Sequence, residues 1–376
     1  MTDIEAAATA PAPQLDSERA TLVEQWAQRH GVATAHRLAA AEDFADAVSK
    51  AITPENTDDT YDKSWRVWQR FCAAQGFPEA EGTRGALIAF VAWLLREGRQ
   101  RPGPRGELGY APTSARLHLE AAVIRLRRDG YPISKDTAAE ARTALEGLTV
   151  QLLKAGERRG RGQAVAADVE GLHAIAAACD DSLTGRRDLA LVLTGFNYAS
   201  RASEPAGLFN GDVTVHSRGL IISVLTGKTK HSVREAKIPY AADPAICPVR
   251  AWIAYREQLV AEHGQERHGR PDDAAFHWID PHGNIRFTTD EDGNKRYGLG
   301  SDGVTRAIKR ISGRAGVPIR WTGHSLRAGL ASTGRCKGKD AVAIADQGGW
   351  ARHSRSMLGY MRRDDGWEDN AAAGLT

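Results

Sequence analysis

The sequence has few cysteines and no long apolar stretch, and these two absences exclude several classes of protein. Its four cysteines, Cys72, Cys179, Cys247 and Cys336, contain no Cys-x-x-Cys pair, so neither a disulfide framework nor a zinc module is expected. The first 20 residues have no basic start and no apolar run, and no later stretch approaches the roughly 18 apolar residues of a membrane span. We therefore expect a protein of the reducing cytoplasm, neither secreted nor inserted into a membrane.

The charge is unevenly distributed along the chain, although the formal total is only +3. Residues 1–50 and 364–376 each carry a net −4, which leaves +11 for residues 51–363. Most of these bases are Arg, whose planar guanidinium suits phosphate better than an ammonium group does. The basic centre favours a polyanionic partner. A GC-rich genome would explain the preference for Arg equally well, so charge alone decides nothing.

Composition and periodicity divide the chain into four parts. Residues 1–53 are an N-terminal extension with a disordered Ala/Pro-rich start and helical character further on. Residues 54–153 form a compact helical domain whose apolar residues recur at helical spacing, with Thr57 as the cap of its first helix. Residues 154–163, KAGERRGRGQ, are too polar and Gly-rich for a core element, so we interpret them as a linker. Residues 164–376 form a larger second domain.

The second domain combines helices with a small antiparallel sheet. Alternating apolar residues over 213–216, 220–225 and 236–240 predict three short strands among helical segments. The stretch 264–300 is rich in loops and carries no assignable pattern. The fold class expected for the whole chain is therefore mainly α with a small antiparallel sheet (α+β).

Unusual polar groups gather in five short segments of the second domain. Each segment alone has an ordinary structural explanation: a surface ion pair, exposed hairpin lysines, a capped helix, a turn before a buried Trp, or a packing Tyr. The residues, in chain order, are Arg201 and Glu204, Lys228 and Lys230, His324 and Arg327, Trp350, and Tyr360. His324 and Arg327 are three residues apart behind Thr322, a helix cap, and the N-terminus of a helix favours anions.

Taken together, these segments resemble the tyrosine recombinases, the phage-integrase family. The matches are R-x-S-E from Arg201, T-K at Thr229 and Lys230, G-H-S-x-R-x-G from Gly323, and G-G-W ending at Trp350, followed by a Tyr before M-R-R. A Trp in place of a second His resembles the branch that includes Cre. The stretch TDDTYDKSWRVWQRFCAAQG resembles the family's core-binding helical domain, so the likeness covers roughly residues 54–376.

The resemblance implies site-specific DNA recombination or integration through a covalent 3′-phosphotyrosine intermediate. Tyr360 would attack a DNA phosphorus and displace the 5′-oxygen. Arg201 and Arg327 would bind the non-bridging oxygens, where negative charge develops. Lys230 would protonate the leaving oxygen, with Lys228 as the local competitor.

The remaining site residues have supporting roles. His324 would assist removal of the proton from Tyr360 or hydrogen-bond the phosphate, and Trp350 would donate its indole N–H to a phosphate oxygen. Glu204 would be repelled by phosphate and is expected to orient Arg201 or His324. No group of residues in the sequence has the donor composition of a divalent-metal site. We therefore expect no cofactor, no ATP requirement and metal-independent catalysis.

Double-stranded DNA is the partner that the resemblance implies, which associates the protein with the nucleoid. The two domains would form a C-shaped clamp around a recombination site, with most contacts made to phosphates. Candidate DNA-binding residues are Lys228, Thr229, Arg116, Arg125 and Arg352. The resemblance also implies a homotetramer on two DNA sites, and we expect a monomer or weak oligomer when the protein is free, with room for an accessory factor. The C-terminal tail, whose residues 367–375 are a helix candidate, would dock on a neighbouring subunit.

One departure keeps alternatives open. Ten positions separate Trp350 from Tyr360, where the family leads us to expect nine. The chain could therefore be a catalytically silent DNA-binding protein of the same fold, with an architectural or regulatory role. A related enzyme of the type IB topoisomerase or telomere-resolvase kind shares the chemistry without exchanging partners. The target sequence and the direction of the reaction are not written in these residues.

Overall fold

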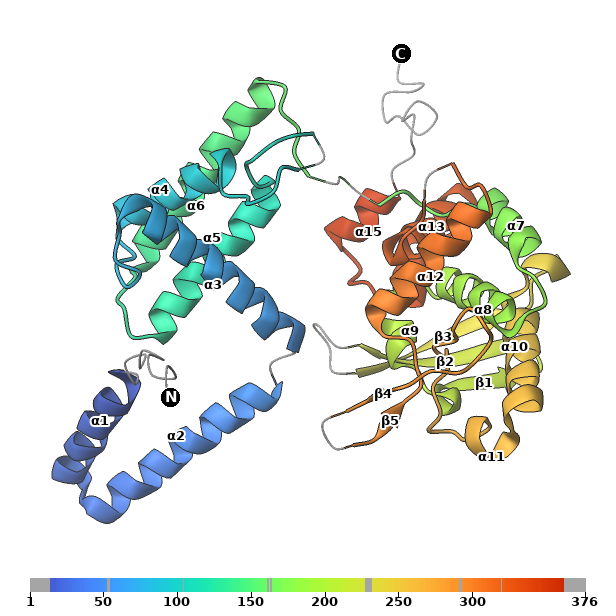
Figure 1. Ribbon diagram of the computed structural model, residues 1–376, viewed down its shortest axis with the longest axis horizontal. Helices are drawn as coiled ribbons and strands as arrows, with labels where there is room; N and C mark the ends of the chain where they lie inside the picture. The colour runs from blue at the N-terminus through green and yellow to red at the C-terminus, as the bar shows by residue number, and fades with distance from the viewer. Residues whose placement is uncertain are drawn as a thin grey trace, which may run out of the picture. The chain divides into compact units, whose positions relative to one another are not determined.

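Two compact units make up the protein in this computed structural model (Figure 1). They comprise Met1–Arg161 and Gly162–Thr376. The boundary falls inside the segment 154–163 that is interpreted above as a linker. The structure describes residues 14–52, 55–103, 105–160, 162, 164–226, 232–290, 293–318 and 320–361.

The first unit is helical, with no strand in its described part. Its helices are α1 Gln14–His30, α2 Val32–Ile52, α3 Glu55–Gln75, α4 Arg84–Arg96, α5 Pro112–Arg128 and α6 Lys135–Lys154. Helix α3 packs against α5, and α4 packs against α6. Thr83 and Ser134 begin α4 and α6, because each side chain accepts a hydrogen bond from a backbone N–H in the first turn.

The core of the first unit is built around aromatic rings of α3 and α4. The fully buried Trp68 meets Phe90 edge to face, with the ring centroids 5.0 Å apart, and Phe71 lies 5.1 Å from Phe90. The prediction that Thr57 caps the first of these helices is wrong, because α3 already begins at Glu55. Acidic residues are favourable in the first turn of a helix, near the positive end of its dipole, so the sequence ENTDD suits a start before Thr57.

His118 makes the first unit sensitive to acid. Its Nδ1 lies 3.0 Å from Ser64 Oγ, and burial, followed by the nearby Arg70, lowers the pKa of His118 to about 4. The unfolded chain takes up this proton near its reference pKa of about 6.5. As the pH falls from about 6.5 to 4, the unfolded state therefore binds more protons than the folded state, and stability is lost. We expect the first unit to lose about 3 kcal/mol over this window.

Hydrogen-exchange mass spectrometry of peptides from α3 to α6 measures this loss. Protection should fall with pH in the wild type and much less in His118→Gln, which keeps a polar group beside Ser64. His36→Gln, at an exposed histidine of the same unit, is the matched control. An equal loss of protection in wild type and His118→Gln would contradict the assignment.

In the second unit, helices pack around a three-stranded antiparallel sheet (Figure 1). The strands are β1 Val213–His216, β2 Gly219–Thr226 and β3 Ser232–Pro239, with a separate pair β4 Thr288–Thr289 and β5 Lys295–Arg296. The α-helices are α7 Val169–Ala178, α8 Leu183–Asn197, α9 Ser203–Gly207, α10 Pro248–His263, α11 Gln265–His268, α12 Ser301–Arg314, α13 Gly323–Cys336, α14 Ala341–Gly348 and α15 Arg355–Tyr360, with 3₁₀ turns at Asn210–Asp212 and Pro244–Ile246. The expected α+β class is confirmed.

The register of the sheet decides which side chains face the core. Leu220, Ile222 and Val224 of β2 are buried and lie opposite Ile238, Ala236 and Arg234 of β3. Helices α8, α10 and α12 supply most of the remaining core. Strand β3 begins four residues earlier than the predicted 236, because charged side chains at its start hid the alternation from the sequence pattern.

The stretch 264–300, which carried no assignable pattern, holds α11 and the β4–β5 pair. The candidate tail helix at residues 367–375 lies outside the described residues. Within the part of the chain that the structure describes, no helix is both long and apolar enough to cross a membrane.

Candidate active site

Arg201 and Glu204 lie where α8 ends and the short helix α9 begins. Glu204 is buried, and its carboxylate accepts two hydrogen bonds from Arg201: one from the guanidinium Nη1 at 2.6 Å and one from the backbone N–H at 2.9 Å. The Arg201 side chain is 41% exposed. The carboxylate therefore holds one edge of the guanidinium while the side chain remains open to solvent.

Arg327 projects from α13 and is anchored at one end. Its Nη1 donates to the carbonyl oxygens of Ala199 and Gly348, each at 2.7 Å. The side chain is buried, and its Nη2 has no hydrogen-bond partner among the described residues. A buried donor without a partner is unusual in a folded protein. This nitrogen is therefore available to a ligand.

The carbonyl of Ala199 reaches Arg327 through a strained backbone. Ala199 has φ +55°, the only positive φ of a non-glycine residue in the described part of the chain. This left-handed conformation costs about 1–2 kcal/mol for a residue with a Cβ. This conformation turns the chain sharply between the end of α8 and Arg201. The short segment from Ala199 to Arg201 therefore carries one arginine and, through the Ala199 carbonyl, anchors the other.

The ring of Trp350 packs against Arg327, and the two glycines before Trp350 leave room for this ring. The guanidinium carbon of Arg327 lies 3.7 Å from the centroid of the Trp350 ring, a cation–π contact. Gly349 has φ +61° and ends α14 in the left-handed conformation that glycine adopts without strain. A Cβ on Gly348 would lie 1.9 Å from the Trp350 ring. The G-G-W sequence therefore allows a tight turn directly against the Trp350 ring.

Replacing Gly348 by alanine is expected to displace Trp350 and destabilise the second unit. Overpacking of this kind costs about 1–3 kcal/mol, which urea denaturation measures. Gly207→Ala is the matched control, because a Cβ there meets nothing within 4 Å and should change stability by less than about 0.5 kcal/mol. Equal stability of the two variants would show that the ring does not need the space at position 348.

Tyr360 ends α15 beside Trp350. The two ring centroids are 6.3 Å apart, and the backbone carbonyl of Tyr360 accepts a hydrogen bond from Ser332 Oγ of α13 at 2.7 Å. The ring of Tyr360 is half-buried rather than enclosed in the core. A turn between Trp350 and α15, closed by a hydrogen bond from the Ser354 N–H to the Ala351 carbonyl at 2.9 Å, leads to Ser354, the cap of the helix.

Positive charge exceeds negative charge in this group of residues. Arg201 and Arg234 both pair with Glu204, Arg234 Nη2 at 3.5 Å from Glu204 Oε2, and Arg327 lies near them. Three guanidiniums and one carboxylate leave an excess of two positive charges. Burial, followed by the neighbouring Arg201, lowers the pKa of Arg327 to about 9, while Glu204 and Tyr360 act in the opposite direction. An anion placed here would relieve the repulsion between the arginines.

Arg234 is a member of this group that the sequence analysis missed. Its Nη1 donates to the carbonyls of Tyr198, at 3.3 Å, and of Gln347, and its side chain is 9% exposed. The period-2 pattern of β3 places Arg234 on the same face as Ala236 and Ile238, both buried. An arginine on the apolar face of a strand was therefore the signal that could have found it.

Of the remaining predicted catalytic residues, His324 lies within the described residues and the lysines after β2 do not. His324 lies in the first turn of α13, three residues before Arg327, and is exposed without a hydrogen bond or ion pair to another described residue. Lys228, Thr229 and Lys230 fall in the connection from β2 to β3, outside the described residues.

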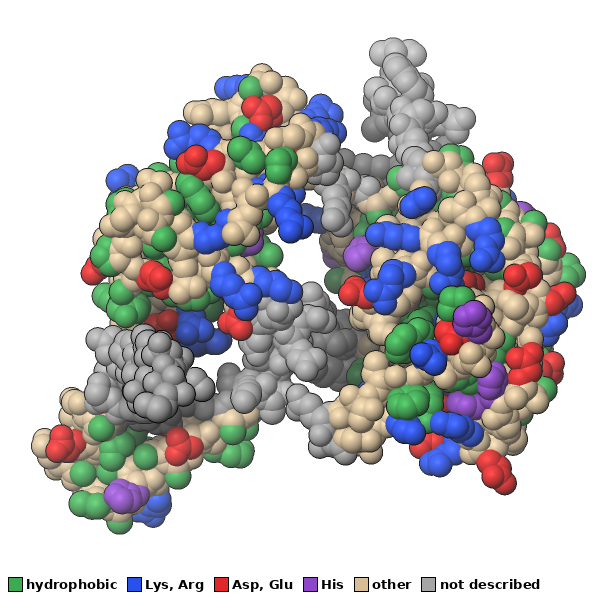
Figure 2. All heavy atoms as spheres, viewed as in Figure 1, with side chains coloured by type: hydrophobic (Ala, Val, Ile, Leu, Met, Phe, Trp, Pro, Cys, Tyr) green, Lys and Arg blue, Asp and Glu red, His purple; other side chains and the backbone are tan. Residues whose placement is uncertain are grey.

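The candidate DNA-binding arginines in described parts are exposed. In the first unit Arg116 pairs with Glu146 at 3.3 Å, and Arg125 pairs with Asp129 at 2.8 Å. Arg352 precedes α15. Figure 2 shows Lys and Arg side chains gathered over the region of α12 and α13 in the second unit, with acidic side chains nearby.

The structure corrects the expectation that no residues have the donor composition of a metal site. His268, Asp273 and His277 are buried together, with one donor atom from each within 4.8 Å of the others. The sequence analysis missed them because they lie in the stretch 264–300, where no pattern indicated which side chains face inward.

Comparison with known proteins places this geometry in context. No family model matches the sequence. An integrase/recombinase XerD homologue of Selenomonas ruminantium is 29% identical over 197 residues, which are 51% of this chain and 52% of that protein. The match thus spans about half the length of this curated relative.

Solved structures of lambda integrase are similar in fold. One, a dimer bound to a COC′ core site, has a TM-score of 0.50 at 14% identity, covering 86% of this chain and 94% of that one. Another, lambda integrase bound to DNA, has a TM-score of 0.50 at 15% identity and covers 86% and 96%. The chain has the fold of a tyrosine recombinase. About half of the chain is also similar in sequence to an integrase/recombinase.

Proposed function

We propose that this protein is a site-specific DNA recombinase or integrase that cleaves and rejoins strands through a covalent 3′-phosphotyrosine, without metal or ATP. The observation that carries the proposal is the group around Arg327. Its buried Nη2 lacks a partner among the described residues, it shares an excess of positive charge with Arg201 and Arg234, and Tyr360 lies beside the Trp350 ring that packs on it. A phosphodiester at this point would meet two fixed guanidiniums and a phenol.

The proposed reaction uses these positions and, for His324 and Lys230, the roles that the resemblance to the tyrosine recombinases implies. The Tyr360 hydroxyl attacks the phosphorus, so that a P–O bond to tyrosine forms and the bond to the 5′-oxygen breaks. Arg201 and Arg327 stabilise the charge that develops on the non-bridging oxygens. His324 takes up the tyrosine proton, and Lys230 donates a proton to the 5′-oxygen. A 5′-hydroxyl from a partner strand reverses the step, so the bond energy is conserved and no nucleotide cofactor is consumed.

Glu204 and Trp350 position the two arginines. Glu204 fixes Arg201 and Arg234 through its two oxygens. Trp350 packs its ring against Arg327, a role beyond the hydrogen bond to phosphate that the resemblance implies. A Trp here rather than a second His favours the branch of the family that includes Cre.

The same proposal extends to the partners. We propose that the protein acts as a homotetramer on two recombination sites, with the helical unit as its core-binding domain and the two units closing as a clamp on duplex DNA. The exposed Arg116, Arg125 and Arg352, together with Lys228 and Thr229, would contact phosphates, which position a protein on DNA without reading sequence.

A covalent-trapping experiment tests the function. DNA fragments retained by the protein are sequenced to find the site, and a nicked duplex with this site is incubated with protein in EDTA and without ATP. A covalent adduct on a denaturing gel is expected. Tight binding without an adduct would instead indicate an architectural protein, and relaxation of a two-site plasmid without exchange would indicate a topoisomerase-like enzyme.

A further inference from the structure

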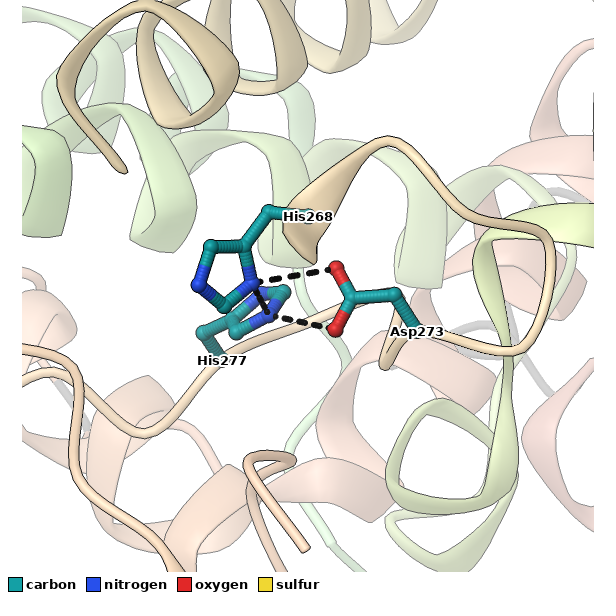
Figure 3. A group of neighbouring side chains, drawn as sticks. All are labelled: His268, Asp273 and His277. Carbon is teal, nitrogen blue, oxygen red and sulfur yellow. Dashed lines mark hydrogen bonds and ion pairs between the residues drawn. The ribbon is translucent and has the colours of Figure 1, made fainter. Parts of the chain in front are cut away.

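Three polar side chains of the second unit point toward one another in a buried cluster (Figure 3). His268 ends α11, and Asp273 and His277 follow in the next loop. Their exposed fractions are 2%, 8% and 0%. His277 Nε2 lies 3.0 Å from Asp273 Oδ1 and 3.1 Å from His268 Nδ1, and His268 Nδ1 lies 3.4 Å from Asp273 Oδ2. Two nitrogens and a carboxylate therefore converge on one point.

One donor atom from each of the three residues lies within 4.8 Å of the others, which suits a single metal ion between them. With metal–ligand bonds of about 2.0–2.1 Å, the donor atoms of tetrahedral zinc are about 3.3 Å apart. His277 Nε2 lies 3.1 Å from His268 Nδ1 and 3.0 Å from Asp273 Oδ1, both close to this value, while His268 Nδ1 approaches the other carboxylate oxygen, Oδ2, at 3.4 Å. Only one proton fits between His268 Nδ1 and His277 Nε2, although Asp273 can accept a hydrogen bond from each ring. A metal ion would use both lone pairs.

Neighbouring groups hold the three side chains in place. The other ring nitrogen of His277, Nδ1, lies 3.0 Å from the Tyr255 hydroxyl, which also accepts a hydrogen bond from the His277 backbone N–H at 3.1 Å. Arg256 Nη2 lies 3.5 Å from Asp273 Oδ2 and donates to the carbonyl of His268. Arg187 donates to the carbonyl of His277 at 2.6 Å. Outer contacts of this kind orient metal ligands.

A cavity borders the cluster at Asp273. Asp273 lines a cavity of about 610 Å³, together with Tyr297, Asp302 and Arg310. Three protein ligands leave a fourth position, which water fills in zinc sites of this composition. Two imidazoles and one carboxylate suit zinc or a similar first-row divalent ion better than calcium or magnesium, which prefer oxygen ligands alone.

We propose that His268, Asp273 and His277 bind one zinc-class divalent ion that fastens α11 to the loop after it. Phe209 and Gly298 form β-bridges with Ala274 and His277, so the ion also braces the segments on both sides. None of its ligands belongs to the group around Arg327, and the site does not depend on the proposed recombination chemistry. It stabilises the second unit, and DNA cleavage does not pass through it.

Zinc titration of the full-length, untagged protein tests the site. The protein is freed of metal with a chelator and titrated with zinc chloride against a chromophoric competitor. We expect one ion per chain in the wild type and an affinity at least about 10- to 100-fold weaker in Asp273→Asn and in His277→Gln. His282→Gln, at an exposed histidine of the same stretch, should bind like the wild type. Circular dichroism checks that each variant is folded.

Cobalt(II) binding to the wild type keeps the proposal testable if the variants do not fold. Intense visible absorption typical of a tetrahedral cobalt site is expected at one equivalent. The proposal would be overturned by the absence of saturable metal binding in folded wild type, or by unchanged zinc binding in both folded variants. A weak octahedral cobalt spectrum at one equivalent would also overturn it.

Discussion

Replacing Tyr360 by phenylalanine is expected to abolish the covalent protein–DNA adduct while leaving the fold and DNA binding intact. The ring of Tyr360 packs beside Trp350, and phenylalanine preserves this contact, so stability should change by less than about 0.5 kcal/mol. The hydroxyl is the proposed nucleophile. Its loss should lower strand cleavage by about 10⁴-fold or more, as loss of a covalent nucleophile does elsewhere.

A denaturing gel of the nicked duplex measures the adduct, and a gel shift measures binding. The dissociation constant for DNA should remain within about two-fold, because affinity comes mainly from basic residues on phosphates. Tyr240→Phe, at an exposed tyrosine after β3, is the matched control and should cleave like the wild type. Adduct formation by Tyr360→Phe at the wild-type rate would mean that another residue is the nucleophile.

Replacing Arg327 by methionine is expected to lower the rate of strand cleavage strongly while changing the stability of the fold only slightly. Removing one fixed donor to a developing anion lowers rates by about 10²–10³-fold, and Arg327 supplies both a hydrogen bond and a charge, so we expect a loss of about 10³-fold. The variant loses the bonds from Arg327 to Ala199 and Gly348, worth about 1 kcal/mol each. It also removes a buried positive charge. Burial lowers the pKa of Arg327 to about 9, so removal of this charge stabilises the fold and offsets the loss of the hydrogen bonds.

Stability should therefore remain within about 1 kcal/mol of the wild type, since the two contributions oppose each other. Urea denaturation and the rate of adduct formation provide the two measurements. Arg250→Met, at an exposed position on α10, should change neither. A variant that is strongly destabilised but, while folded, cleaves at the wild-type rate would assign Arg327 a structural role only.

The helices and the sheet could be predicted because their signals are local. Apolar spacing in α3 and α4 and alternation in β1 and β2 depend on a few neighbouring residues. The start of β3 could not be predicted, since Arg234 interrupts the alternation while pointing inward to Glu204. A charged residue on an apolar face becomes intelligible only when its partner, distant in sequence, is known.

The candidate site likewise combines residues that the sequence could indicate with contacts that it could not. Arg201, Glu204, Arg327, Trp350 and Tyr360 could be singled out by resemblance, and the structure brings them together with the addition of Arg234. The anchoring of Arg327 by the carbonyls of Ala199 and Gly348 could not be foreseen, because backbone carbonyls leave no trace in a sequence. The same holds for His268, Asp273 and His277, which only the folded loop brings together.

The central claim is that Arg201, Arg327 and Tyr360 act on one DNA phosphate. Mass spectrometry of the peptide that remains attached to DNA after trapping on a nicked site tests it most directly. The account predicts a 3′-phosphate joined to the Tyr360 oxygen, in an amount that falls sharply in Arg201→Gln and Arg327→Met. Attachment through any other residue, or undiminished attachment in both arginine variants, would contradict it.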